Sequence, residues 1–304
     1  MRIPIHRWMS PLALALLLVA SGCDTEPTAV NEDEAAIQAL IQDEFDFFTA
    51  DLFSGTTESG TTPFGKALEA IEPWRFGRLI ESVDRYVDIQ ISNPAGEPAI
   101  AEVTWTADIH GTFVVVAKDS AHTAYSKVFT NNAIRFATFE KRGLNTDPRR
   151  GWRLVGISGT ESVSDPHSVQ IVSVNLTSTG GVDTTFTNVS ELMNRENIIA
   201  FAPLDTVTVT VTTTNIDDVV LLHHPAWQAL HVNRNHVRRM LTNNGDGTYT
   251  GTWIVQGQVW MNGYTYNHAR KRHFTIDVLS NGTLYDDTEP YDNMSWSTIY
   301  AVRP

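Results

Sequence analysis

Residues 99–110 read AIAEVTWTADIH, and their apolar side chains occupy alternate positions. Val103, Trp105 and Ile109 share one face of an extended chain, and polar residues fill the opposite face. A period of two is typical of a β-strand that buries one face. The same alternation occurs in VDRYVDIQI, residues 83–91. Further strands, separated by turn-forming stretches, are predicted at 112–117, 122–130, 133–141 and 151–161.

A helical pattern precedes these strands. Asn31 and Glu34 have the spacing of a capping box, which predicts the start of a helix. One apolar face follows at helical spacing, with Ile37, Leu40, Ile41, Phe45, Phe48 and Leu52. A second helical stretch is predicted at 64–80, interrupted at Pro73. Helices followed by an antiparallel meander predict an α+β domain with one sheet face covered.

Three stretches of this region carry a family resemblance. EAAIQALIQDEFDFF at 34–48, IRFATFEKRG at 134–143 and GWRLVGIS at 151–158 resemble the two ends of an NTF2-like (SnoaL-like) α+β cone. The resemblance covers residues 32–163 and implies a cone with an interior pocket. NTF2-like domains include both enzymes and plain binding modules, so the fold alone does not decide the function.

The helical pattern nearly disappears after ESVSDPHS, residues 161–168, and we place a domain boundary there. About eight short strand candidates follow, and the clearest is Asp205–Thr214, where valine alternates with threonine. NNGDGTY, residues 243–249, predicts a tight hairpin turn. Residues 167–304 are therefore predicted to form an all-β immunoglobulin-like sandwich. GTLYDDTEPYDNMSW, residues 282–296, resembles C-terminal Ig-like modules of bacterial surface lipoproteins.

The first 23 residues have the order of a secretory signal. Arg2 and Arg7 precede an apolar run at 12–20, which is too short to cross a bilayer as a helix. Ala20-Ser21-Gly22-Cys23 resembles a bacterial lipobox, which implies a signal peptide at 1–22, a lipid on the Cys23 thiol and a tether at 23–31. Cys23 is the only cysteine in the chain. The alternative is ordinary cleavage that leaves an incidental thiol.

This reading places the protein in a bacterial cell envelope, lipid-anchored to a membrane after export. The sequence does not decide between the inner and the outer membrane. The formal net charge is −13, which argues against a nucleic-acid partner, since such partners favour basic surfaces.

No catalytic residue and no cofactor is predicted. The alternation sends the acidic residues of the first strands to the face opposite the apolar one, where we expect them to be solvated. Nucleophile-elbow, Walker and dinucleotide-binding motifs do not occur. The candidate pocket residues are Arg85, which falls on the apolar face of its strand, and Tyr86 and Tyr125, which a bulge could turn inward.

The predicted sandwich contains three further features. His223, His224, His231 and His236 are close in sequence, but the first two are adjacent on a strand and should point to opposite faces, so no metal site is predicted. NHVRR at 235–239 and NHARKRH at 267–273 are basic. If their strands adjoin, Arg238, Arg239, Arg270, Lys271 and Arg272 form one positive patch for lipid headgroups or anionic polysaccharide. Trp260, Tyr264 and Tyr266 are candidates for a sugar-stacking platform.

These features favour a membrane-anchored, non-catalytic binding or assembly module with a protein or polysaccharide partner in the envelope. Two alternatives stay open. One is a small-molecule isomerase, lyase or hydrolase that uses the NTF2-like pocket. The other is a carbohydrate-binding accessory protein.

Overall fold

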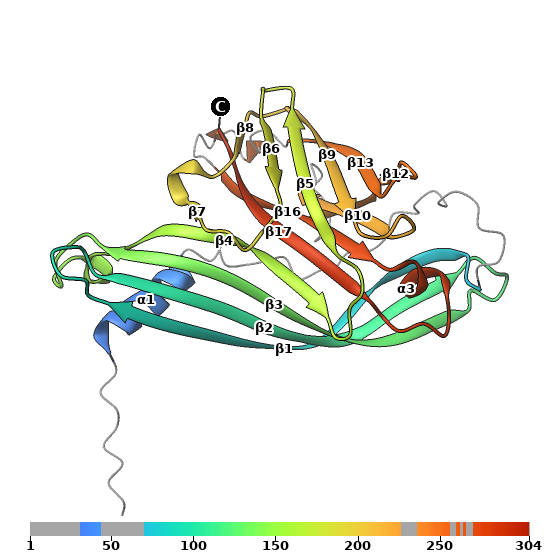
Figure 1. Cartoon of the computed structure of the whole chain (residues 1–304), viewed down its shortest axis with the longest axis horizontal. Coiled ribbons are helices and arrows are strands. Elements are labelled where there is room, and N and C mark those ends of the chain that lie inside the picture. The colour runs from blue at the N-terminus through green and yellow to red at the C-terminus, as the bar shows by residue number, and fades with distance from the viewer. Residues whose placement is uncertain are drawn as a thin grey trace, which may run out of the picture. The chain divides into compact units, whose positions relative to one another are not determined.

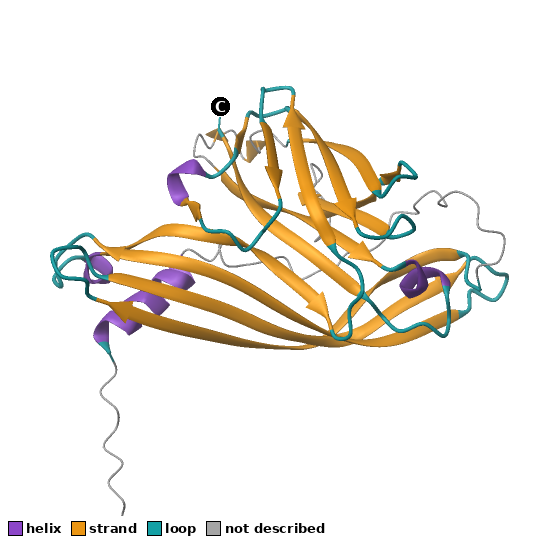
Figure 2. Ribbon diagram, in the orientation of Figure 1, coloured by secondary structure: helices purple, strands orange, loops and turns teal. Residues whose placement is uncertain are grey.

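The computed structural model describes residues 31–43, 70–225, 236–255, 260–261, 264–265 and 270–303. Strands dominate this part of the chain (Figure 2). Its helices are α1 (Glu32–Asp43) and the five-residue α3 (Asn281–Tyr285), with two 3-10 turns, η1 (Pro148–Gly151) and η2 (Arg195–Asn197). None of the helices in these ranges is long and apolar enough to span a membrane.

Within the described residues, ten strands form the larger sheet, in the order β1-β2-β3-β4-β17-β16-β10-β11, with β7 paired to β4 and β8 to β17. Their bounds are β1 (Pro73–Ser92), β2 (Ile100–Ala117), β3 (Ala124–Lys141), β4 (Trp152–Ser164), β7 (Met193–Asn194), β8 (Ala200–Phe201), β10 (Val219–Pro225), β11 (His236–Met240), β16 (Arg270–Leu279) and β17 (Asn293–Val302). The first four are long antiparallel neighbours (Figure 1). Strand β17 then pairs with β4, with Ser297 opposite Thr160, so early and late parts of the chain share one sheet.

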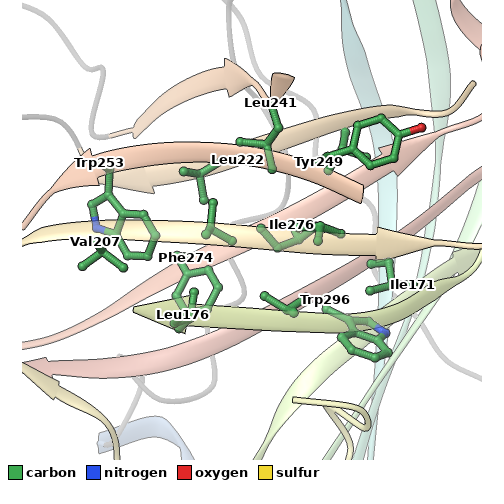
Figure 3. Close-up of a cluster of buried hydrophobic side chains, with 14 of the residues drawn as sticks. Ile171, Leu176, Val207, Leu222, Leu241, Tyr249, Trp253, Phe274, Ile276 and Trp296 are labelled. Carbon is green, nitrogen blue, oxygen red and sulfur yellow. The ribbon is translucent and has the colours of Figure 1, made fainter. Parts of the chain in front are cut away.

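A second sheet of the described residues has the order β12-β13-β9-β5-β6. These strands are β5 (Ile171–Ser178), β6 (Asp183–Phe186), β9 (Thr206–Thr213), β12 (Thr242–Asn243) and β13 (Thr248–Ile254). Two short strands, β14 (Trp260–Met261) and β15 (Tyr264–Thr265), pair separately. In Figure 3, Val207 and Leu176 from the second sheet lie near Phe274 and Ile276 of β16. The second sheet therefore packs on one face of the larger sheet.

The other face of the same strands is also covered. Val219 and Leu221 of β10 belong to an apolar cluster with Ile109 and Phe113 of β2, so the larger sheet folds back onto itself. A third cluster lies where α1 packs, and it joins Ile37 and Ile41 of the helix to Phe139, Trp152 and their neighbours. Strands β10, β16 and β17 are thus the middle layer, buried on both faces.

The NTF2-like prediction is wrong. The described residues contain one long strand meander and only two short α-helices, so the α+β fold class is not present. The second predicted helix is wrong from residue 73 onward, where β1 begins instead. By contrast, the alternation of residues 99–110 is confirmed, since β2 buries every second side chain.

The immunoglobulin-like prediction is also wrong. The strands that face the second sheet belong to the sheet that contains β1–β4, so they do not form a separate sandwich. The expected boundary at 163–167 lies inside a compact unit of residues 32–304. The predicted signal peptide, Cys23 and the tether up to residue 30 lie outside the described residues.

Candidate functional site: a buried polar network

Asp277 on β16 is the centre of a buried polar network. Both of its carboxylate oxygens accept hydrogen bonds from the Arg78 guanidinium on β1, at 2.8 and 2.9 Å. The two side chains are 0% and 2% exposed. A bidentate pair of this kind combines strong charge-assisted bonds with a fixed orientation. It connects the first strand of the larger sheet to its middle layer.

Three more side chains surround the pair. Arg78 Nε donates to the Tyr291 hydroxyl at 2.6 Å, and Asn293 Nδ2 donates to Asp277 Oδ1 at 2.6 Å. His223 Nε2 of β10 lies 3.2 Å from Asp277 Oδ2. We call these five residues, Arg78, His223, Asp277, Tyr291 and Asn293, the Asp277 network.

The charged groups of the Asp277 network change one another's pKa values. Burial by itself would raise the pKa of Asp277, but Arg78 and His223 outweigh it and keep this pKa well below its ordinary range. Burial lowers the pKa of His223 and outweighs the hydrogen bond and the charge of Asp277, which act in the opposite direction. Asp277 already accepts from Arg78 and Asn293 and lies beside His223, which leaves it poorly suited to take a proton from a substrate.

Arg238 on β11 joins the same region from the far edge of the sheet. Its Nη2 donates to the Phe76 carbonyl of β1 at 2.6 Å, and its guanidinium lies 4.3 Å from the centre of the Phe76 ring. Burial lowers the pKa of Arg238 to about 10. The first and last strands of the sheet are therefore connected by a buried side chain.

A row of polar side chains crosses the interior beside the network. Cross-strand pairing places these residues in line through β3, β4, β17, β16, β10 and β11: Arg135, Thr160, Ser297, Thr275, His223 and Arg238. All six are 8% exposed or less. Burial lowers the pKa of Arg135 to about 9. This polar row separates the apolar cluster around Phe113 from the one around α1.

The three candidate pocket residues are not brought together. Arg85 and Tyr86 are exposed, and they pair with Ala107 and Thr106 of β2. Tyr125 is half-buried and pairs with Val115, at the other end of β2. These three residues do not line a common pocket.

The predicted positive patch is divided. Strand β10 lies between β11 and β16, so the two basic stretches are not on adjacent strands. Arg238 is buried, Arg239 is exposed, and Lys271 and Arg272 are half-buried. The side chain of Arg270 lies outside what the structure describes, as do those of Trp260, Tyr264 and Tyr266.

His223 and His224 point to opposite faces of β10, as the alternation predicts. His223 belongs to the Asp277 network, whereas His224 stacks near Trp253 on the opposite face, with ring centres 6.3 Å apart. His231 and the His236 side chain lie outside the described residues. Among the residues that are described, no group of three or more His, Cys, Asp or Glu side chains could hold a metal ion.

Sequence reasoning missed Arg78 and Asp277. Arg78 falls on the same strand face as apolar Phe76 and Ile80, a signal of the kind that singled out Arg85. Asp277 lies on the opposite strand face from Phe274, Ile276 and Val278, on the face that carries the polar residues His273 and Thr275. It is buried because β16 is covered on both sides. Comparisons with protein-family models, curated proteins and solved structures each found no match.

Proposed function

We propose that the chain is a bacterial envelope lipoprotein, anchored through a lipid on Cys23, whose β-rich body is a non-catalytic binding or assembly module. The observation that supports this most is the stretch Ala20-Ser21-Gly22-Cys23, in which two small residues lead from the end of an apolar run to the only cysteine of the chain. A thioether to a lipid requires one thiol and no second cysteine. Two or more acyl chains then hold a protein at a bilayer stably.

The start of the body supports this assignment. Helix α1 begins at Glu32, so only residues 24–31 separate Cys23 from the first helical residue. A lipid on Cys23 would keep the β-rich body close to the membrane surface.

The buried ionisable groups support a non-catalytic role. Arg78 of β1 and His223 of β10 both contact Asp277 of β16. A catalytic acid or base must instead be within hydrogen-bond reach of a substrate. The alternative, an enzyme that uses an NTF2-like pocket, requires an NTF2-like fold, and the described residues do not form one.

The anchor is tested by Cys23→Ser, with Ser21→Ala as the matched control. We expect the control to fractionate with membranes and to enter the detergent phase, and Cys23→Ser to lose both properties. Mass spectrometry of the mature wild-type protein should find an acylated N-terminal Cys23. An unmodified N-terminus, or one at another residue, would refute the proposal.

A further inference from the structure

The outer face of the second sheet consists mostly of threonine. Strand β9 turns its valines toward the larger sheet, where they join the apolar cluster that contains Phe274. Its threonines point the other way, as do the residues that pair with them on β13 and β5. We call these ten residues the threonine face: Thr206, Thr208, Thr210 and Thr212 of β9, Thr248, Thr250 and Thr252 of β13, and Ser173, Asn175 and Thr177 of β5.

The threonine face is a regular array. Cross-strand pairing forms three rows, each with one residue from β13, β9 and β5: Thr248-Thr212-Ser173, Thr250-Thr210-Asn175 and Thr252-Thr208-Thr177. Neighbours in a row are about 4.8 Å apart, which is the distance between adjacent strands. Successive rows are about 6.7 Å apart, because each strand advances by two residues between them. Hydroxyl and methyl groups therefore repeat in two directions.

The threonine face carries no charge, although the whole chain has a net charge of −13. Its residues are half-buried, except Thr252, which is exposed. A charged residue lies at its border, where Asp183 of β6 pairs with Thr177. The face also has no aromatic ring of the kind that stacks on sugars. An uncharged ligand without a stacking surface fits it best.

The hydroxyls in the centre of the face are available to water. In the part of the chain that the structure describes, the four threonine hydroxyls of β9 make no hydrogen bond to protein, whereas Thr248 and Thr250 donate to Asp246 and Asn244 in the neighbouring turn. Each hydroxyl of β9 offers one donor and two acceptor positions. Because the χ1 angle of threonine is restricted, these hydroxyls keep fixed directions. Water bound to them is therefore held at the repeats of the strands.

We propose that the threonine face binds the surface of ice. The repeats along and across its strands are close to the spacings between oxygen atoms on the prism faces of hexagonal ice, so water held by the face can join the crystal. Adjacent strands are rotated by about 20–25°, and the match is therefore best along β9 and its immediate neighbours. This ligand goes beyond the proposed function, and its binding does not depend on the Cys23 anchor.

The experiment measures how much of the purified full-length protein, kept in detergent, enters a slowly growing ice crystal. Thr208→Tyr places a ring in the central strand of the face and holds the ice surface away from it. We expect the wild type to be incorporated several-fold more than Thr208→Tyr. Thr104→Tyr is the matched control, since Thr104 is a half-buried threonine on the polar face of β2, and it should behave as the wild type. Thermal melts followed by circular dichroism confirm that each variant is folded.

A second pair of variants tests the face without adding bulk. Thr210→Val removes a hydroxyl and keeps the volume, whereas Thr210→Ser removes a methyl group, and each should reduce incorporation into ice. Exclusion of the wild type from ice to the same extent as Thr208→Tyr would overturn the proposal, and so would equal incorporation of all variants. If the excluded wild type is retained on an insoluble neutral polysaccharide and Thr208→Tyr is not, the proposal is overturned and the face is assigned to a sugar ligand.

Discussion

Arg238, on the last strand of the larger sheet, donates a 2.6 Å hydrogen bond to the backbone carbonyl of Phe76 on the first strand. In a fully closed barrel, neighbouring backbones would provide bonds of this kind. In the described part of this sheet a side chain makes the bond between the two edges. The same guanidinium stacks on the Phe76 ring.

Arg238→Leu should destabilise the fold by about 1–3 kcal/mol, because a buried carbonyl loses a charged donor. Urea denaturation would measure the change. The adjacent Arg239→Leu is the control, since Arg239 is exposed, and it should stay within about 0.5 kcal/mol of the wild type. Equal effects of the two substitutions would show that the bond to Phe76 is unimportant.

Asp277→Asn should cost about 3–5 kcal/mol, because it leaves the Arg78 guanidinium buried without its countercharge. The pKa of Asp277 is held below its unfolded value of about 3.9, so its stabilisation is present above about pH 4 and is lost as the pH falls. Acid-unfolding curves of the wild type and Asp277→Asn should therefore converge at low pH. A parallel pair of curves would contradict this assignment. Asp84→Asn, at an exposed position of β1, is the control.

Asp218, just before β10, should have the opposite pH dependence. It is 5% exposed, and its Oδ2 has no hydrogen-bond partner among the described residues. Burial is the main cause that raises its pKa to about 6, against hydrogen bonds from Asn215 and Thr213 that lower it, and the charge of Asp292 adds to the rise. The folded-state pKa exceeds the unfolded value of about 3.9, so stability is lost as the pH rises from about 4 through 6. Asp218→Asn should be about 2 kcal/mol more stable than the wild type above pH 7, and equal to it below about pH 4, in thermal melts. A constant difference across this range would mean that Asp218 does not titrate there.

Two buried threonines should respond differently to the same substitution. Thr160 Oγ1 in the polar row has no hydrogen-bond partner in the described ranges, whereas Thr283 Oγ1 accepts from the Asp292 N–H at 2.7 Å. Thr160→Val should be neutral or stabilising. Thr283→Val should cost about 1–3 kcal/mol, since it leaves a buried donor unsatisfied. Differential scanning calorimetry would compare them, and a large loss for Thr160→Val would reveal a partner for its hydroxyl.

Strand character could be predicted because alternation is local, but the divisions between strands were wrong: residues 100–117 form one strand, β2, and residues 124–141 form one strand, β3, with no turn at 130–132. In β2, Val103 and Trp105 are separated by one polar residue, and in β9 the same is true of Val207 and Val209. This alternation predicts the buried face of each strand. The start of α1 after Asn31 follows in the same way from capping and helical spacing. These signals depend only on neighbours in the sequence.

The arrangement of the strands could not be predicted in this way. The pairing of Thr160 with Ser297 joins residues far apart in the chain, and no local pattern encodes it. The alternation in β16 marks one face as polar, but it does not show that Asp277 on this face is fully buried by contacts with β1 and β17. The network was missed because a strand covered on both faces can carry polar residues inside, provided that they are paired.

Strand β17 occupies the centre of the larger sheet, between β4 and β16, although residues 293–302 come last in sequence among the described strands. Whether the chain emerges from a ribosome or passes through a membrane channel, β4 lacks this neighbour until residues 294–297 have arrived. Contacts of such long sequence separation form slowly. The unfinished meander would expose β-strand edges during that interval, so a chaperone that shields strand edges should raise the yield of folded protein.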